Sequence, residues 1–108
     1  MLSSTHRHGI HPIFVAACFD HEKCLEILIE AGANLNVVDK SNRTAAFAAA
    51  SNRHLDSLKL LVARGADLSI ADSRLKMTPL HCACLLGHYA SVEAILESDL
   101  VEADKLLN

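Results

Sequence analysis

The sequence predicts an all-α solenoid of three stacked helix pairs joined by hairpin-like connecting loops. Three observations predict it: a segment recurs three times along the 108 residues, each copy contains two short amphipathic patterns, and the composition suits close packing of small apolar side chains. Because only 4% of the residues are aromatic and none is Trp, the core must consist of many Leu, Ile, Val and Ala side chains. Stability should therefore come from stacking one copy on the next.

The recurring segment begins at His11, Thr44 and Thr78. Thr44 follows His11 by 33 residues, and Thr78 follows Thr44 by 34. Two further columns keep the same register: His21, His54 and His88, and the pairs Gly32-Ala33 and Gly65-Ala66. We divide the chain, as one domain, into these parts: a lead-in at 1–8 and three repeats at 9–41, 42–75 and 76–108, the last with the C-terminal tail.

Each repeat is predicted to contain two short helices. The hydroxyl of Thr44 or Thr78 can cap the first helix, and Pro12 or Pro79 fits its first turn, where a missing N–H costs nothing. The second helices have apolar residues at i, i+3 and i+4: Leu25, Leu28 and Ile29, then Leu58, Leu61 and Val62, then Val92, Ile95 and Leu96. Gly32 and Gly65 should end them in a left-handed conformation, whereas the third repeat has Ser98-Asp99 instead.

Polar connectors follow the two glycines, at residues 34–42 and 67–76. Their Asp, Ser and Asn content favours tight reversals of the chain. The second connector has one residue more than the first, which explains the longer offset of 34 residues.

The best-kept copy, Thr78-Pro79-Leu80-His81 with Gly87-His88, resembles the ankyrin-repeat motif, and the resemblance extends over about residues 9–99. The departures from the motif are Phe14 and Phe47 for its histidine, Ala45 for its proline, and Asp20 and Arg53 for the glycine before the paired histidine. The resemblance implies an L-shaped solenoid of helix pairs and hairpin tips that binds other proteins without catalysis.

In this family the hairpin tips and the exposed face of the first helices form a concave binding surface. The resemblance therefore implies a protein-binding role for Val38, Lys40, Ser41, Arg43, Ser73, Arg74, Leu75 and Met77 at the tips. It implies the same role for Cys18, Phe19, Ser51, Asn52, Leu85 and Leu86 on the first helices. If Phe19, Leu85 and Leu86 are exposed, they form apolar anchors beside a polar and basic rim; the alternative is that they cover a further repeat or a terminal extension.

The resemblance also places Asn36 in the hairpin column where ankyrin repeats are substrates of an asparaginyl hydroxylase. Possible hydroxylation of Asn36 stands beside a structural alternative, in which its side chain caps the hairpin. Similarly, His21, His54 and His88 are interpreted as sharing a structural role, bridging the turn between the two helices of each repeat.

The Cys and His residues between His81 and His88 suggest a zinc site as a remote alternative. On a helix, however, Cys82 and Cys84 lie about 200° apart, so they cannot easily hold one ion, and their columns contain small residues such as Ala50. We interpret both cysteines as small core residues and expect no metal and no cofactor. Since the chain has no nucleophile motif or glycine-rich phosphate loop, we also expect no enzymatic activity.

The charge and hydropathy patterns limit the classes of partner. A net charge of −3 with scattered basic residues predicts no nucleic-acid binding. No apolar run approaches the roughly 20 residues of a membrane span, and no signal peptide is evident, so we expect an intracellular protein, cytoplasmic or nuclear, with reduced thiols.

The expected partner is a protein of unknown identity. An alternative function is that of a structural spacer or substrate-receptor arm in a larger complex, such as a ubiquitin ligase adaptor. We expect the chain to be monomeric or part of a longer repeat array. Its amphipathic tail, at 99–108, does not complete another repeat, which suggests a segment of a longer array; the alternative is that the tail folds back as a cap.

Overall fold

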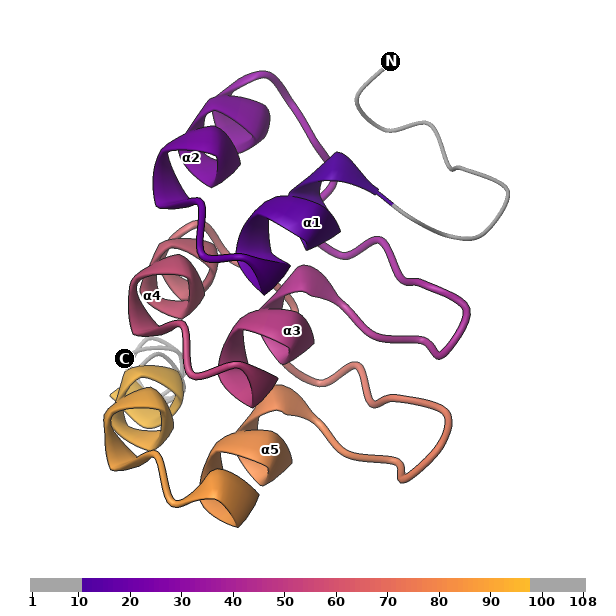
Figure 1. Ribbon diagram of the computed structural model, residues 1–108, viewed down its shortest axis with the longest axis vertical. Helices are drawn as coiled ribbons and strands as arrows, with labels where there is room; N and C mark the ends of the chain where they lie inside the picture. Colours follow the sequence, from indigo (N-terminus) through magenta and orange to yellow (C-terminus); the bar gives the residue numbers. More distant parts are fainter. Residues whose placement is uncertain (1–10, 98–108) are drawn as a thin grey trace, which may run out of the picture.

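The computed structural model describes residues 11–97 and shows six helical segments in that part of the chain (Figure 1). They are α1 (Pro12–Cys18), α2 (Glu22–Glu30), α3 (Ala45–Ser51), α4 (Leu55–Ala63), α5 (Pro79–Leu86) and a last helix at residues 89–97. Residues 11–97 contain no strand, so the predicted all-α class is confirmed. The lead-in at 1–8 and the tail from Ser98 onward lie outside the described residues.

The helices form two layers, with the connecting loops projecting on the side away from the second layer (Figure 1). The first helices of the repeats, α1, α3 and α5, stack beside one another, and α2, α4 and the helix at 89–97 form the second layer. The central helix α3 packs against α1, α4 and α5, while α2 packs against α1 and α4. Each helix is too short to be stable alone, so these contacts between repeats hold the fold together.

The first helices begin where the sequence predicts, and two of them are capped as predicted. The Thr44 hydroxyl accepts a 3.1 Å hydrogen bond from the Phe47 amide. Thr78 and His81 form a reciprocal pair, because the Thr78 hydroxyl accepts from the His81 amide at 3.4 Å while His81 Nδ1 accepts from the Thr78 amide at 3.1 Å. His11 occupies the equivalent position before α1 and makes no side-chain capping bond.

Left-handed backbone positions recur at the ends of the helices. Gly32 and Gly65 have φ angles of 97° and 88°, as predicted for the ends of the second helices. The turn between the two helices needs the same conformation at Gly87, where φ is 68°, and also at Asp20 and Arg53, where φ is 58° and 61°. The departures from the motif therefore change the residue and keep the geometry.

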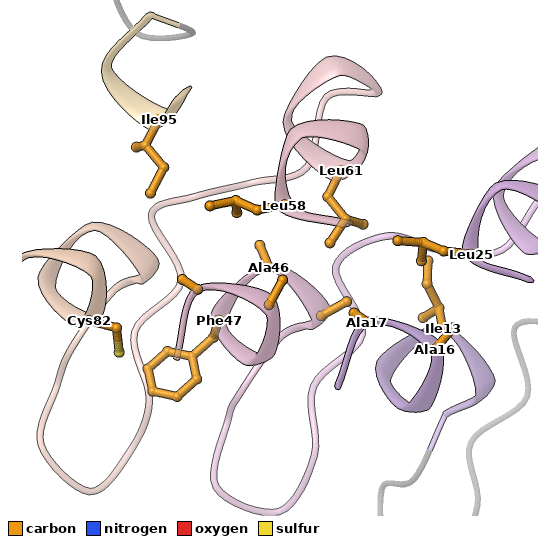
Figure 2. Close-up of a cluster of buried hydrophobic side chains, with 13 residues drawn as sticks. Ile13, Ala16, Ala17, Leu25, Ala46, Phe47, Leu58, Leu61, Cys82 and Ile95 are labelled. Carbon is orange, nitrogen blue, oxygen red and sulfur yellow. The ribbon is translucent and has the colours of Figure 1, made fainter. Parts of the chain in front are cut away.

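The core lies between the two layers, where branched side chains meet small ones (Figure 2). Leu25, Leu58, Leu61 and Ile95 of the second layer are at most 1% exposed. They face a first layer whose buried residues are mostly small, and because an alanine leaves room for a neighbouring backbone, the helices can approach closely. The first-layer residues of the cluster are Ile13, Ala16, Ala17, Ala45, Ala46, Phe47, Ala49, Ala50 and Cys82.

The prediction that both cysteines of α5 are core residues is wrong for one of them. Cys82 is buried, but Cys84 is exposed. Its counterparts Ala17 and Ala50 are buried because α3 packs on α1 and α5 packs on α3. Within residues 11–97 no further first-layer helix follows α5, so the same column is open at Cys84.

Candidate protein-binding site

The tip of the first loop is organised by the carboxylate of Asp39. Its Oδ1 accepts hydrogen bonds from the Ser41 amide at 2.9 Å and the Arg43 amide at 2.8 Å. Its Oδ2 accepts a 2.8 Å hydrogen bond from Arg43 Nε and forms an ion pair with Arg43 Nη2 at 2.7 Å. The guanidinium carbon of Arg43 also lies 5.7 Å from the centre of the Phe14 ring, a cation–π distance. Arg43 therefore stabilises the loop itself.

The tip of the second loop uses Asp72 in the same way. The Asp72 carboxylate accepts from the Met77 amide at 2.7 Å and from the Leu75 amide at 3.3 Å. The backbone closes each loop beside its aspartate, since the Asp39 amide donates to the Arg43 carbonyl and the Asp72 amide donates to the Met77 carbonyl. The second pair is one residue further apart, which locates the extra residue of the second connector between Asp72 and Met77.

These hydrogen bonds lower the pKa of both aspartates. For Asp39, burial alone would raise the pKa, but the Arg43 side chain, its amide and its charge together lower it. For Asp72, the hydrogen bond from the Met77 amide is the main cause of the lowered pKa and outweighs the opposing effect of desolvation. Both carboxylates are therefore ionised at neutral pH, as their structural role requires.

The two tips are joined to each other. The Ser73 amide donates to the Ser41 carbonyl at 2.8 Å, and the Asn42 side-chain amide donates to the Ala71 carbonyl at 2.9 Å. Asn42 adopts a left-handed φ of 60°, a conformation that Asn tolerates better than most residues. The loops consequently form one connected edge, which projects from the first layer (Figure 1).

The residues predicted for binding fall into two groups. The tip group lies on the joined loops, and its members Lys40, Arg43, Ser73, Arg74 and Leu75 are exposed, while Val38, Ser41 and Met77 are half-buried. The helix-end group lies at the C-terminal ends of the first helices, where Phe19, Asn52 and Leu85 are exposed and Cys18, Ser51 and Leu86 are half-buried. A first helix of 7 residues, about 10 Å long at about 1.5 Å of rise per residue, lies between the two groups.

Hydrogen bonds between repeats also fix the helix-end group. The Asn52 side chain donates to the Cys18 carbonyl at 3.4 Å, and the Arg53 guanidinium donates to the Leu86 carbonyl at 3.2 Å. The exposed apolar side chains nearby, Phe19 at 65% and Leu85 at 74%, are therefore presented on a braced scaffold. The predicted exposure holds for these two residues and is incomplete for Leu86.

Two exposed side chains escaped the sequence prediction. Lys76, the last residue of the second connector, is exposed and has a left-handed φ of 58°. Tyr89, at the start of the last helix, is 76% exposed. The column of Tyr89 gives no consistent signal, since its counterpart Glu22 is exposed whereas its counterpart Leu55 is half-buried.

Asn36 links neighbouring repeats. Its side-chain oxygen accepts a 2.8 Å hydrogen bond from the Asp67 amide, while its own amide donates to Asn34 Oδ1 at 2.8 Å. The structural alternative for Asn36 thus has a specific contact, and this contact joins two loops rather than capping one. Hydroxylation of the exposed Asn36 side chain stays a prediction.

The three aligned histidines do not share one contact. His54 Nε2 bonds the Cys18 carbonyl of the preceding repeat at 3.0 Å, whereas His88 Nδ1 bonds Ser91 of its own helix at 2.7 Å. His21 is exposed, and its ring lies tilted beside Phe19, with the ring centres 6.4 Å apart. The prediction of one bridging role is therefore wrong for the side chains, although His21 and His54 both precede the second helix of their repeats.

The zinc alternative finds no supporting geometry. Within residues 11–97, no three His, Cys, Asp or Glu side chains converge on a point that could hold a metal ion. Cys82 is buried, and its burial and the nearby charge of Asp72 raise the pKa of its thiol, so it is a poor source of thiolate. His81 Nδ1 is hydrogen-bonded to the Thr78 hydroxyl.

Among the described residues no helix is long and apolar enough to cross a membrane.

Comparison with known proteins agrees with this geometry. A family model described as ankyrin repeats, in three copies, matches residues 13–107. Rabankyrin-5 from Mus musculus and Rabankyrin-5 from Homo sapiens are each 34% identical to this chain over 102 residues, which is 94% of its length. The chain spans about 9% of the length of these curated relatives.

Proposed function

The chain belongs to the ankyrin-repeat family, and on that premise we propose that it is a non-enzymatic module that binds another protein through its tip group and helix-end group. Ankyrin repeats are in general protein-interaction modules. We keep the repeat boundaries of the sequence prediction, 9–41, 42–75 and 76–108, and an intracellular location as parts of this proposal.

The observation that carries the proposal is the exposure of large apolar side chains on the side of the molecule that carries the loops and first helices. Leu75 at the tip is 71% exposed, and Leu85 at the end of α5 is 74% exposed. Leucine side chains on a braced scaffold, with polar residues around them, match the anchor-and-rim arrangement of protein interfaces.

The test uses the variants Leu75→Ser and Leu85→Ser together with Ile27→Ser as a matched control. Ile27 is 55% exposed on α2, in the other layer, so the control removes a comparable apolar surface away from the proposed site. A partner is first identified by photo-crosslinking from position 75. Its affinity, measured by calorimetry, should fall by at least about tenfold in each of the two site variants, as for an interface hot spot, and stay unchanged in Ile27→Ser. Equal losses in all three variants would contradict the proposal.

A second candidate is a spacer or substrate-receptor arm within a larger complex, such as a ubiquitin ligase adaptor. It is favoured by the finding that this chain spans only 9% of the length of its relatives, because a short part of a long protein can serve to connect other parts. A spacer needs the stacked repeats and not the exposed leucines. If Leu75→Ser and Leu85→Ser leave every complex of the full-length protein intact, the spacer function is supported instead.

A further inference from the structure

Some charged side chains of the tips bond within the loops, and the others are exposed to solvent without an ion-pair partner in residues 11–97. Two carboxylates, Asp39 and Asp72, accept backbone amides of their own loops, and Asp39 also pairs with Arg43. The remaining charged residues of the tips, at 39–43 and 72–77, are Lys40, Arg74 and Lys76, which are exposed and form no ion pair with another residue of 11–97. The exposed Asp67 lies at the base of the second loop, where its carboxylate accepts from the Ser69 amide. The outward charge of the tips is therefore positive.

The geometry of the loops brings these cations to one edge. Lys40 directly precedes Ser41, whose carbonyl accepts the hydrogen bond from Ser73, and Arg74 directly follows Ser73. Leu75, 71% exposed, lies between Arg74 and Lys76 in the chain. The tip edge, as we name Lys40, Arg74, Leu75 and Lys76, thus combines three cations with one apolar side chain on loops whose backbone is already ordered, which reduces the entropy cost of binding.

The second layer has the opposite character. Its acids, all exposed except the half-buried Glu26, outnumber its bases, and the whole chain has a net charge of −3. The acids of the second layer are Glu22, Glu26, Glu30, Asp56, Glu93 and Glu97, against Lys23, Lys59 and Arg64. The positive edge is therefore a local feature, and a partner that carries negative charge is steered to the tips rather than to the helices behind them.

We propose that the tip edge binds an acidic segment of a partner protein, in which carboxylates meet Lys40, Arg74 and Lys76 and an apolar side chain packs on Leu75. This inference rests on the proposed function and adds the chemistry of the partner. A nucleic acid is less favoured, because it gains affinity from long rows of phosphate contacts, whereas this edge has three cations on a chain of net negative charge. A membrane surface is also less favoured, because the tip edge offers a single exposed leucine and stable membrane anchoring needs more buried apolar area.

In the experiment, peptides that bind the 108-residue chain are selected from a random library of 12-residue peptides displayed on phage. The tip variant is Lys40→Glu with Arg74→Glu, and the matched control is Lys23→Glu with Lys59→Glu, which changes the net charge equally on exposed residues of α2 and α4. The selected peptides should be enriched in Asp and Glu around a Leu, Ile or Phe. The affinity of these peptides for the tip variant should be at least about tenfold lower than for the unchanged protein. Replacing the Asp and Glu of a peptide with Asn and Gln, or raising the salt concentration, should lower its affinity for the unchanged protein by a similar factor, whereas the control variant should change the affinity by less than about twofold.

The outcomes separate this inference from the proposed function. Peptides without an acidic excess that still lose affinity with Leu75→Ser would overturn the acidic partner and leave the interaction module standing. Peptides that are insensitive to both Leu75→Ser and Leu85→Ser would overturn both. Tip-dependent binding of polyuridylate or of phosphatidylserine vesicles, without any acidic peptide, would likewise overturn the inference in favour of a nucleic acid or a lipid surface.

Discussion

The side-chain oxygen of Asn36 and the backbone amide of Asp67 are 2.8 Å apart and form a hydrogen bond across 31 residues of sequence. The bond connects the turn after α2 with the turn after α4, so it couples the first repeat to the second outside the apolar core. In a solenoid each such contact contributes to the interface between neighbours, on which cooperative folding depends.

Replacing Asn36 with Ala should lower the free energy of unfolding by about 1 kcal/mol, because it removes this bond between repeats. The control is Asn34→Ala, which removes only a local hydrogen bond to the Asn36 amide. Urea unfolding followed by circular dichroism checks both variants. A loss in Asn34→Ala as large as that in Asn36→Ala would show that the bond between repeats has no special weight.

Lys76→Gly should stabilise the protein by about 1 kcal/mol, since a left-handed residue with a Cβ is strained and glycine is not. Lys76 has a φ of 58°, and its exposed side chain makes no hydrogen bond or ion pair within residues 11–97 that would be lost.

The comparison for Lys76→Gly is Asp20→Gly, at a residue with the same φ of 58°. The Asp20 carboxylate accepts a 2.8 Å bond from the hydroxyl of Ser57, which is fully buried. Removing it leaves that hydroxyl without its acceptor, so Asp20→Gly should be destabilising despite the relief of strain. The melting temperature should therefore rise in Lys76→Gly and fall in Asp20→Gly. A lower melting temperature for Lys76→Gly would refute the strain argument.

Local signals in the sequence were enough to place the helices. Thr44 and Thr78 start the first helices of their repeats, because a hydroxyl before an apolar run can satisfy free amides. Gly32 and Gly65 end the second helices α2 and α4, because little else adopts their φ at low cost. These effects act within a few residues, so periodicity and a resemblance between copies reveal them.

What the sequence could not reveal depends on neighbours in space. Arg43 reads as a free surface cation, but in the structure it is held by Asp39 and lies over Phe14. Cys84 aligns with buried alanines and is exposed, because its burial depends on a further helix and not on its own column. The tip edge is similar, since its members come together through the hydrogen bonds between the loops, from Ser73 to Ser41 and from Asn42 to Ala71.

Acid should weaken the fold through the loop aspartates. The pKa of Asp39 is lowered from the ordinary value of 3.8 in the folded chain, so its ionised form adds stability above about pH 4, and that stability is lost as the pH falls through the lowered value. Asp39→Asn should cost about 1 kcal/mol at pH 6 and less at pH 2.5, because the stability that the Asp39 charge adds declines as the pH falls from about 4 toward the lowered pKa. Urea midpoints at the two pH values measure the difference, and an equal cost at both would contradict the role of the Asp39 charge.

The capping position of α1 offers the last prediction. His11 is only 2% exposed, and neither of its ring nitrogens has a hydrogen-bond partner among the described residues, whereas threonine at the same position caps α3 and α5. His11→Thr should supply a cap worth about 1 kcal/mol and remove buried polar atoms that cost about 1–3 kcal/mol, which together exceed the packing lost with the ring. His11→Ala separates the two effects, because it removes the ring without adding a cap. We expect the urea midpoint to be highest for His11→Thr; if His11→Ala is equally stable, the gain comes from removing the ring alone, and the threonine does not cap α1.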